Sequence, residues 1–217
     1  MGQVLAELGN LGIIPVAVVS HAEDAPRLAE ALSQAGLPCV EITFRTSAAE
    51  EAIRQTTHLF PQMLVGAGTI LSPNQARKAV AAGARFVVSP GFDSKVVSWC
   101  LNRGIPITPG VATATEISMA LDKGLKVVKF FPAEELGGVR MLRALGAAYA
   151  TVRFIPTGGI SPDNLASYLR LPMVHACGGS WLAKNDLIQD GKFAEITRLA
   201  KEALNIVQQV REGSNLR

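Results

Sequence analysis

Cysteine is scarce in this chain, and its placement argues against one class of protein. The three cysteines among 217 residues, Cys39, Cys100 and Cys177, lie far apart and form no Cys-x-x-Cys spacing. An odd number of separated cysteines, without a secretion signal before them, argues against a disulfide-stapled secreted protein. We therefore expect a cytoplasmic protein whose thiols are reduced and act as small buried hydrophobic groups.

Long apolar runs, blocks of one charge and metal-ligand motifs are also missing. No apolar stretch approaches the roughly 20 residues that span a bilayer, so no membrane span is expected. The formal net charge of +3 is spread along the chain, which argues against nucleic-acid or membrane binding through a basic patch. The three histidines are far apart and no HExxH or Cys/His spacing exists, so no metal is expected.

Eight short apolar runs rich in β-branched residues recur along the chain, with helical patterns between them. Their starts are 20 to 26 residues apart. This interval fits a strand, a turn, a helix of two to three turns and another turn. The predicted strands are Ile13–Val19, Leu37–Phe44, Met63–Thr69, Phe86–Pro90, Pro106–Val111, Val127–Pro132, Arg153–Gly159 and Met173–Gly179.

Helix signals separate these strands. Serine followed by proline marks two helix starts, at Ser72-Pro73 and Ser161-Pro162, and glycine marks several helix ends. Strict alternation of strands and helices predicts a parallel sheet, and eight such units favour a closed (β/α)₈ barrel over an open sheet. No GxGxxG loop follows the first run, and no linker interrupts the pattern, so residues 1–217 are expected to form one α/β barrel domain.

Lys129 is the first candidate for chemistry. It lies inside the apolar run Val127-Val128-Lys129-Phe130-Phe131-Pro132, where burial of an ammonium group is costly. A desolvated amine has a lowered pKa and can attack a carbonyl to form a Schiff base. The alternative is a lysine whose apolar stem is buried while its head reaches solvent.

Glu41 and Arg45 belong to the second predicted strand and its end. By strand alternation Glu41, Thr43 and Arg45 are expected on one side. A carboxylate inside a barrel could be a general acid and base beside the amine, or half of a structural ion pair. Arg45 could clamp a substrate carboxylate, or it could be a solvated arginine at a loop start.

Two glycine pairs end the last two predicted strands. They are Gly158-Gly159 and Gly178-Gly179, the second followed by Ser180. Glycine lets backbone N–H groups approach an anion closely, and a helix N-terminus adds a favourable dipole. The loops after strands seven and eight of this fold frequently bind phosphate. One pair alone would usually be a turn, whereas two pairs at these positions indicate a phosphate site.

Four motifs remain to be considered together: Gly66-Ala67-Gly68-Thr69, Ser89-Pro90-Gly91, Lys129-Phe130-Phe131-Pro132-Ala133-Glu134 and Pro156-Thr157-Gly158-Gly159-Ile160. In this order and spacing they resemble the bacterial KDPG/KHG aldolases, the class I aldolases of 2-keto-3-deoxy-6-phosphogluconate and 4-hydroxy-2-oxoglutarate. The resemblance covers nearly the whole chain and implies a homotrimeric cytoplasmic lyase of the Entner–Doudoroff pathway, without metal or other cofactor.

The resemblance also implies a role for individual residues. Lys129 matches the Schiff-base lysine and Glu41 the general acid and base. Thr157 lies where related phosphogalactonate aldolases usually differ, which favours the gluconate epimer. The remaining matches hold the substrate: Arg45 and Thr69 at its carboxylate, Pro90 and Phe131 along the pocket, and Gly158, Gly159, Gly179 and Ser180 at its phosphate.

Two other readings of the sequence stay open at this stage. A sugar-phosphate epimerase or a thiamine-phosphate synthase-like transferase would share the glycine loops but would not require an amine at position 129. A non-catalytic sugar-phosphate-binding barrel would be expected to lack Lys129 or Glu41, and both are present. The choice between the phosphorylated sugar acid and the hydroxy-oxoglutarate as main substrate is also left open.

Overall fold

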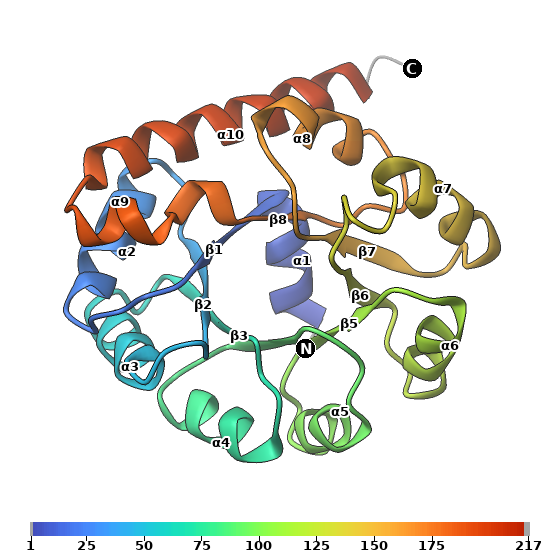
Figure 1. The fold of residues 1–217 in the computed structure, drawn as a ribbon, viewed down its shortest axis with the longest axis horizontal. Helices are drawn as coiled ribbons and strands as arrows, with labels where there is room; N and C mark the ends of the chain where they lie inside the picture. Colours follow the sequence, from blue (N-terminus) through green and yellow to red (C-terminus); the bar gives the residue numbers. More distant parts are fainter. Residues whose placement is uncertain (1, 215–217) are drawn as a thin grey trace.

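The computed structural model describes residues 2–214 and has a barrel of eight parallel strands (Figure 1). The strands neighbour one another in the order β7-β6-β5-β4-β3-β2-β1-β8. Isolated bridges from Phe154 to Val174 and from Thr157 to Gly178 join β7 to the β8 segment and close the ring. The strands are β1 Ile13–Ala17, β2 Cys39–Thr43, β3 Leu64–Gly68, β4 Phe86–Ser89, β5 Ile107–Val111, β6 Val127–Phe130, β7 Arg153–Pro156 and β8 Cys177–Gly179.

Helices surround the strands, and one begins the chain (Figure 1). The (β/α)₈ barrel expected from the sequence is confirmed, with each predicted strand present in a shorter form. The helices are α1 Gly2–Leu11, α2 Asp24–Gln34, α3 Ala49–Leu59, α4 Pro73–Ala81, α5 Ser94–Leu101, α6 Ala114–Asp122, α7 Gly138–Ala148, α8 Pro162–Leu169, the 3₁₀ helix η1 Ser180–Ala183, α9 Asn185–Gln189 and α10 Phe193–Ser214.

The capping residues predicted from the sequence lie at the helix ends in the structure. Ser72 is the N-cap of α4, where its hydroxyl accepts a hydrogen bond from the backbone N–H of Gln75 at 3.2 Å. Pro73 follows at the first helical position, where its missing N–H costs nothing. Gly36 lies just beyond α2 in the left-handed region, with φ of 84°, which ends that helix as predicted.

The cysteines also match their prediction, since all three are free and buried. Burial raises the pKa of the Cys100 thiol to about 12. Burial also raises the pKa of Cys177 and of Cys39, and the negative charge of Glu41 adds to the effect at Cys39. The three thiols therefore stay protonated near neutral pH and act as small hydrophobic groups. None of the helices within residues 2–214 is long and apolar enough to cross a membrane.

The interior of the barrel holds a separate hydrophobic cluster, and α1 contributes to it. Leu8 of α1 is fully buried among side chains from the first residues of several strands, including Cys39, Leu64 and Phe86. Figure 1 shows α1 lying within the ring of strands. Arg211 of α10 donates a hydrogen bond to the carbonyl oxygen of Gly9 at 2.6 Å, near the carboxyl end of α1. The first helix therefore plugs the amino-terminal end of the barrel.

Replacing Leu8 with alanine is expected to destabilise the fold by about 3 kcal/mol, because it leaves a cavity in the plug that neighbours cannot fill. The measurement is the free energy of unfolding in urea. Val4→Ala is the matched control on the same helix, because Val4 is only partly buried against this cluster and should cost less. Equal losses for the two variants would contradict the role of Leu8.

Candidate functional site

Lys129 and Glu41 meet inside the barrel. Lys129 is on β6 and Glu41 on β2, four positions apart in the ring of strands, so their side chains can meet only across the interior. Lys129 Nζ lies 3.5 Å from Glu41 Oε1, and the side chains are 7% and 5% exposed. The Phe131 ring lies beside the amine, its centroid 5.0 Å from Nζ. The alternative of a lysine head in solvent is therefore wrong.

One oxygen of the Glu41 carboxylate lacks a hydrogen bond within the described residues. This atom, Oε1, is buried and faces the amine. Buried polar atoms without a partner are rare in folded proteins, and they cluster where function requires them. A carboxylate oxygen in this state is available to accept a proton or a hydrogen bond from a bound molecule.

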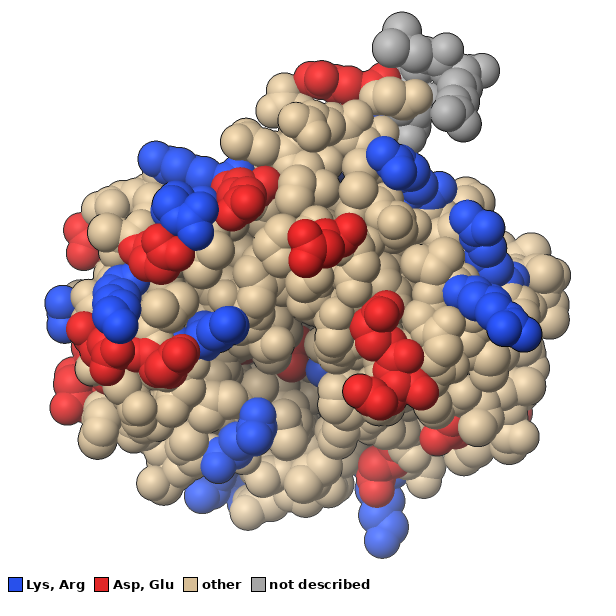
Figure 2. All heavy atoms as spheres, turned by 45° about the horizontal axis from the view of Figure 1, so that its top comes forward, with Lys and Arg blue, Asp and Glu red and all other residues tan. Residues whose placement is uncertain are grey.

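A hollow near the middle of the molecule contains acidic and basic atoms side by side (Figure 2). On the rest of the face drawn both signs occur. They alternate closely on the left, whereas on the right basic side chains lie beside one another, apart from a group of acidic ones. The distribution agrees with the spread of charge along the sequence. Among the described residues, no group of three or more histidine, cysteine, aspartate or glutamate residues could hold a metal ion.

The two glycine pairs lie after β7 and β8, where the strands end. Gly158 and Gly159 have φ of 96° and 75°, a conformation that side chains other than glycine rarely adopt, and α8 begins three residues later. Gly179 ends β8, and Ser180 is exposed at the first position of η1. Each loop therefore leads into the N-terminus of a helix, where backbone N–H groups are free of helical partners.

Thr157 links the glycine loops to the interior. It is buried, follows the last residue of β7, and forms the bridge with Gly178 that closes the barrel. Its Oγ1 atom lies 2.3 Å from where a side chain at Gly178 would begin, so the two residues fit together only because position 178 is glycine. This contact brings the two predicted glycine pairs next to each other.

Three further predicted residues follow the ends of β3, β4 and β6. Thr69 is a residue other than glycine with positive φ, at 55°, directly after β3. Such a conformation is strained, and it often occurs at ligand sites. Pro90 and Phe131 follow the last residues of β4 and β6, and both are partly buried. These placements bring all three to the carboxyl ends of the strands.

Arg45 does not obey the alternation that the sequence suggested. β2 ends at Thr43, so Arg45 lies in the following turn, where it is exposed, while Glu41 and Thr43 are buried. The alternation of sides holds only while the backbone stays extended, and the turn breaks it. Arg45 remains at the carboxyl end of β2, on the same side of the barrel as the glycine loops.

Gly68 has a close contact with the candidate site that sequence reasoning missed. A side chain at Gly68 would begin 2.1 Å from Glu41 Oε1. A glycine inside a predicted strand was the only available signal, since it can mark a close approach of another group. Gly68 appeared in the sequence only as part of a motif, and nothing in that motif identifies the carboxylate as its neighbour.

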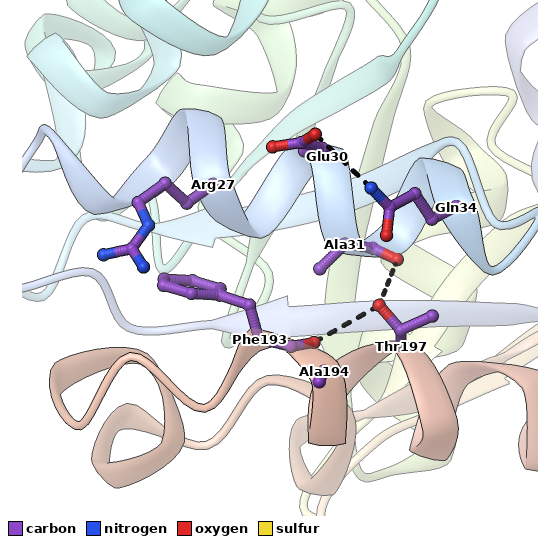
Figure 3. A pocket seen from close by; sticks show the side chains of 7 residues that line it. All are labelled: Arg27, Glu30, Ala31, Gln34, Phe193, Ala194 and Thr197. Carbon is purple, nitrogen blue, oxygen red and sulfur yellow. Dashed lines mark hydrogen bonds between the residues drawn. The ribbon is translucent and has the colours of Figure 1, made fainter.

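A groove of about 230 Å³ between α2 and α10 lies outside the barrel (Figure 3). Arg27 stacks on the Phe193 ring at 4.3 Å, and Thr197 donates a hydrogen bond to the carbonyl oxygen of Ala31 at 2.9 Å. These contacts join the last helix to the second one. The groove is lined by none of the residues predicted from the sequence to act in catalysis or binding.

Comparison with known proteins gives consistent matches over most of the chain. Residues 4–199 match the family model described as "KDPG and KHG aldolase". A 2-dehydro-3-deoxy-phosphogluconate aldolase of Treponema pallidum is 50% identical over 204 residues, which cover 94% of this chain and 97% of the relative.

Two solved structures are similar in both fold and sequence. A KDPG aldolase of Legionella pneumophila, with pyruvate captured as a covalent carbinolamine intermediate, has a TM-score of 0.88 and 40% identity, covering 93% of this chain and 97% of that one. A 2-keto-3-deoxy-6-phosphogluconate aldolase of Zymomonas mobilis, with 3-phosphoglycerate, has a TM-score of 0.84 and 39% identity, covering 92% and 94%.

Proposed function

Because this chain belongs to the KDPG and KHG aldolase family, we propose how the residues of its barrel perform the reaction of that family. The protein is a class I aldolase that cleaves 2-keto-3-deoxy-6-phosphogluconate to pyruvate and glyceraldehyde 3-phosphate, a step of the Entner–Doudoroff pathway, and cleaves 4-hydroxy-2-oxoglutarate to pyruvate and glyoxylate. The observation that carries the proposal is the 3.5 Å contact between Lys129 Nζ and Glu41 Oε1 inside the barrel.

Lys129 is the nucleophile in this proposal. Its neutral amine attacks the C2 ketone and gives a carbinolamine, and loss of water leaves a protonated imine bonded to Nζ. The imine is an electron sink for the next step. The position of Lys129 on a strand, with its side chain enclosed, holds the nitrogen in one place for attack.

Glu41 is the general acid and base. It removes the proton from the C4 hydroxyl, directly or through a water molecule, and the C3–C4 bond breaks with its electron pair moving toward the imine nitrogen. The aldehyde leaves, and the remaining enamine is protonated at C3 and hydrolysed to pyruvate and free Lys129. The buried Oε1 atom without a hydrogen-bond partner supports this role.

The remaining residues hold the two ends of the substrate. We assign Arg45 and Thr69 to binding of the substrate carboxylate. Pro90 and Phe131 form the pocket wall in this proposal, and Thr157 selects the gluconate epimer. The phosphate is assigned to the loops of Gly158, Gly159, Gly179 and Ser180. The positive φ of Gly158 and Gly159, and the helix that begins after each loop, support close approach of backbone N–H groups. Binding energy from the phosphate then orients the reacting carbons.

Borohydride reduction in the presence of pyruvate tests the proposal. The expected product is a stable pyruvyl adduct on Lys129, identified by mass spectrometry as a modified peptide in which trypsin no longer cleaves after that residue. Lys126 is the matched control, because it is exposed and precedes the same strand. A Lys126→Ala variant should still form the adduct. Absence of an adduct on Lys129 would refute the proposed chemistry.

Gly159→Ala is expected to separate the two substrates. A side chain there would begin 2.5 Å from Glu134 Cβ and would have to adopt φ of 75°, so the loop must move. Loss of one or two hydrogen bonds to a phosphate should raise the KM for the phosphorylated substrate about 10- to 100-fold. The KM for 4-hydroxy-2-oxoglutarate, which carries no phosphate, should change little.

Gly104→Ala is the control for that substitution. Gly104 also has positive φ, at 68°, but it follows α5 and has open space around it. Steady-state kinetics on both substrates should show no selective change for this variant. If Gly159→Ala raised the two KM values equally, the assignment of the loop to phosphate would be wrong. The kcat/KM ratio of the unmodified enzyme also shows which substrate it prefers.

We further propose that the enzyme is a cytoplasmic homotrimer in which residues 1–217 form one domain, as the family resemblance implies. The mass measured by light scattering after size exclusion should be three times the 22.9 kDa of one chain. A mass equal to one chain at micromolar concentration would overturn the trimer without affecting the assignments of Lys129 and Glu41.

A further inference from the structure

Four strand glycines each occupy a place where a side chain would collide with a neighbour. The first atom of such a side chain would lie within 2.3 Å of another group at every one of these positions. Real side chains essentially never show contacts under 3.0 Å. The pairs are Gly66 with the Phe86 ring, Gly68 with the Glu41 carboxylate, Gly110 with the Pro90 carbonyl oxygen and Gly178 with the Thr157 hydroxyl.

Gly68 differs from the others because its neighbour is the carboxylate that faces Lys129. In the sheet, Glu41 is paired with Gly66, and Thr43 is paired with Gly68. The Glu41 side chain therefore runs along β3 toward the carboxyl end of that strand. A side chain at Gly68 would begin 2.8 Å from its Cγ, 2.7 Å from its Cδ and 2.1 Å from its Oε1.

The oxygen that rests on Gly68 is the same oxygen that faces the amine. Oε1 lies 3.5 Å from Lys129 Nζ and has no hydrogen-bond partner among the described residues. No hydrogen bond within the described protein fixes this atom, so its position depends on the ion pair with Lys129 and on packing. The surface on which it packs is the bare backbone of Gly68.

The backbone at this position does not itself require glycine. Gly68 is absent from the residues of the described chain that have positive φ, unlike Gly158 and Gly159 in the phosphate loop. Glycine inside a strand weakens it, through greater chain entropy and the loss of a side chain to pack. The space above the Gly68 backbone is thus the one local feature that accounts for glycine here.

We propose that Gly68 is a positioning residue for the aldolase reaction, which holds the Glu41 carboxylate within reach of Lys129 and the bound substrate by leaving room for it. The inference rests on the proposed role of Glu41 as acid and base. Any side chain at position 68 would have to displace Oε1 from 2.1 Å to at least 3.4 Å, the start of ordinary contact distance, which is a shift of more than about 1 Å. A misplacement of that size can cost about 100-fold in rate.

Gly68→Ala should therefore lower kcat about 100-fold for both substrates, while the KM values change little because the phosphate loops and Arg45 are untouched. Gly66→Ala is the matched control on the same strand, since its side chain would meet the Phe86 ring at 2.2 Å rather than a carboxylate. That variant should lose thermal stability while the kcat of the folded enzyme stays within a few-fold. An equal kcat loss in both variants would overturn the proposal.

A double-mutant cycle separates positioning from general damage to the barrel. Glu41→Asp shortens the side chain and withdraws the carboxylate from position 68. In that background Gly68→Ala should lower kcat less than about fivefold, against about 100-fold when Glu41 is present, because the collision is relieved. The same loss in both backgrounds would show that Gly68 does not act through Glu41.

Thermal unfolding provides a second test that works even if Gly68→Ala is inactive or folds poorly. In a Glu41→Ala background the colliding carboxylate is gone, so adding Gly68→Ala should leave the melting temperature unchanged or raise it. In the presence of Glu41 it should lower the melting temperature. Equal decreases in both backgrounds would overturn the inference.

The two proposals fail in different ways. If the unmodified enzyme gives no pyruvyl adduct on Lys129 after borohydride reduction, the proposed chemistry is wrong. If the adduct forms but the kinetic and thermal cycles are additive, only the role of Gly68 is wrong.

Discussion

Lys129→Ala should abolish aldol cleavage, with kcat/KM falling by at least about 10⁴-fold. The substitution removes the atom that bonds to the C2 carbon, so neither the imine nor its electron sink can form. A group held in position can react as if its concentration were about 10⁵ M or more. No amine in solution reaches such a concentration, so none can replace Lys129. The measurement is the rate of pyruvate release, coupled to its reduction by a dehydrogenase.

Two companion variants make the Lys129 result specific. Lys129→Met keeps an apolar stem of similar length inside the barrel and should be as inactive as Lys129→Ala, which excludes a cavity as the cause. Lys126→Ala removes an exposed lysine three residues earlier and should leave the rate within a few-fold. Substantial cleavage by either Lys129 variant would contradict the Schiff-base mechanism.

Glu41→Gln should lower kcat about 10²- to 10⁴-fold while leaving the fold intact. The amide keeps the size and shape of the side chain over Gly68, but it cannot take the proton from the C4 hydroxyl. Because Lys129 is retained, borohydride should still trap pyruvate on it, although more slowly. The variant is therefore expected to separate amine chemistry from proton transfer.

The measurements for Glu41→Gln are single-turnover cleavage and the extent of adduct formation. Gln55→Glu is the control, because it exchanges an amide and a carboxylate at a position outside the candidate site. Gln55 lies on α3, is only partly buried and donates a hydrogen bond to Glu51. This variant should leave kcat unchanged. Turnover by Glu41→Gln at the rate of the unmodified enzyme would remove Glu41 from the proposed proton transfer.

Local periodicity was enough to predict the strands, because alternating apolar runs and helix caps are properties of short segments. All eight strands were placed correctly, and each had at least one end predicted too far out. The seventh was predicted to continue to Gly159, whereas β7 ends at Pro156 and the glycines after it have positive φ. The eighth was predicted from Met173, whereas β8 begins at Cys177. Turn conformation outweighs composition at such boundaries.

Contacts across the barrel could not be derived from the pattern. The sequence indicated that Lys129 and Glu41 both face inward, but the 3.5 Å between their terminal atoms depends on how β2 and β6 are brought opposite each other when the ring closes. The contact between Gly68 and Oε1 was also out of reach, because it depends on the register between β2 and its neighbour β3 and on the direction of the Glu41 side chain. The prediction for Arg45 failed for a different reason. Strand alternation was applied to a residue that lies in an exposed turn after the end of β2.

The plug formed by α1 has a kinetic consequence. The packing around Leu8 fills the amino-terminal end of the barrel, so we expect molecules to reach Lys129 from the carboxyl ends of the strands. The aldehyde, whose phosphate is assigned to the loops at those ends, must leave before the pyruvyl group that is bonded deeper inside. In the synthetic direction pyruvate must enter first. On these assignments, access from one end of the barrel and the covalent bond to Lys129 lead us to expect the same order of addition and release.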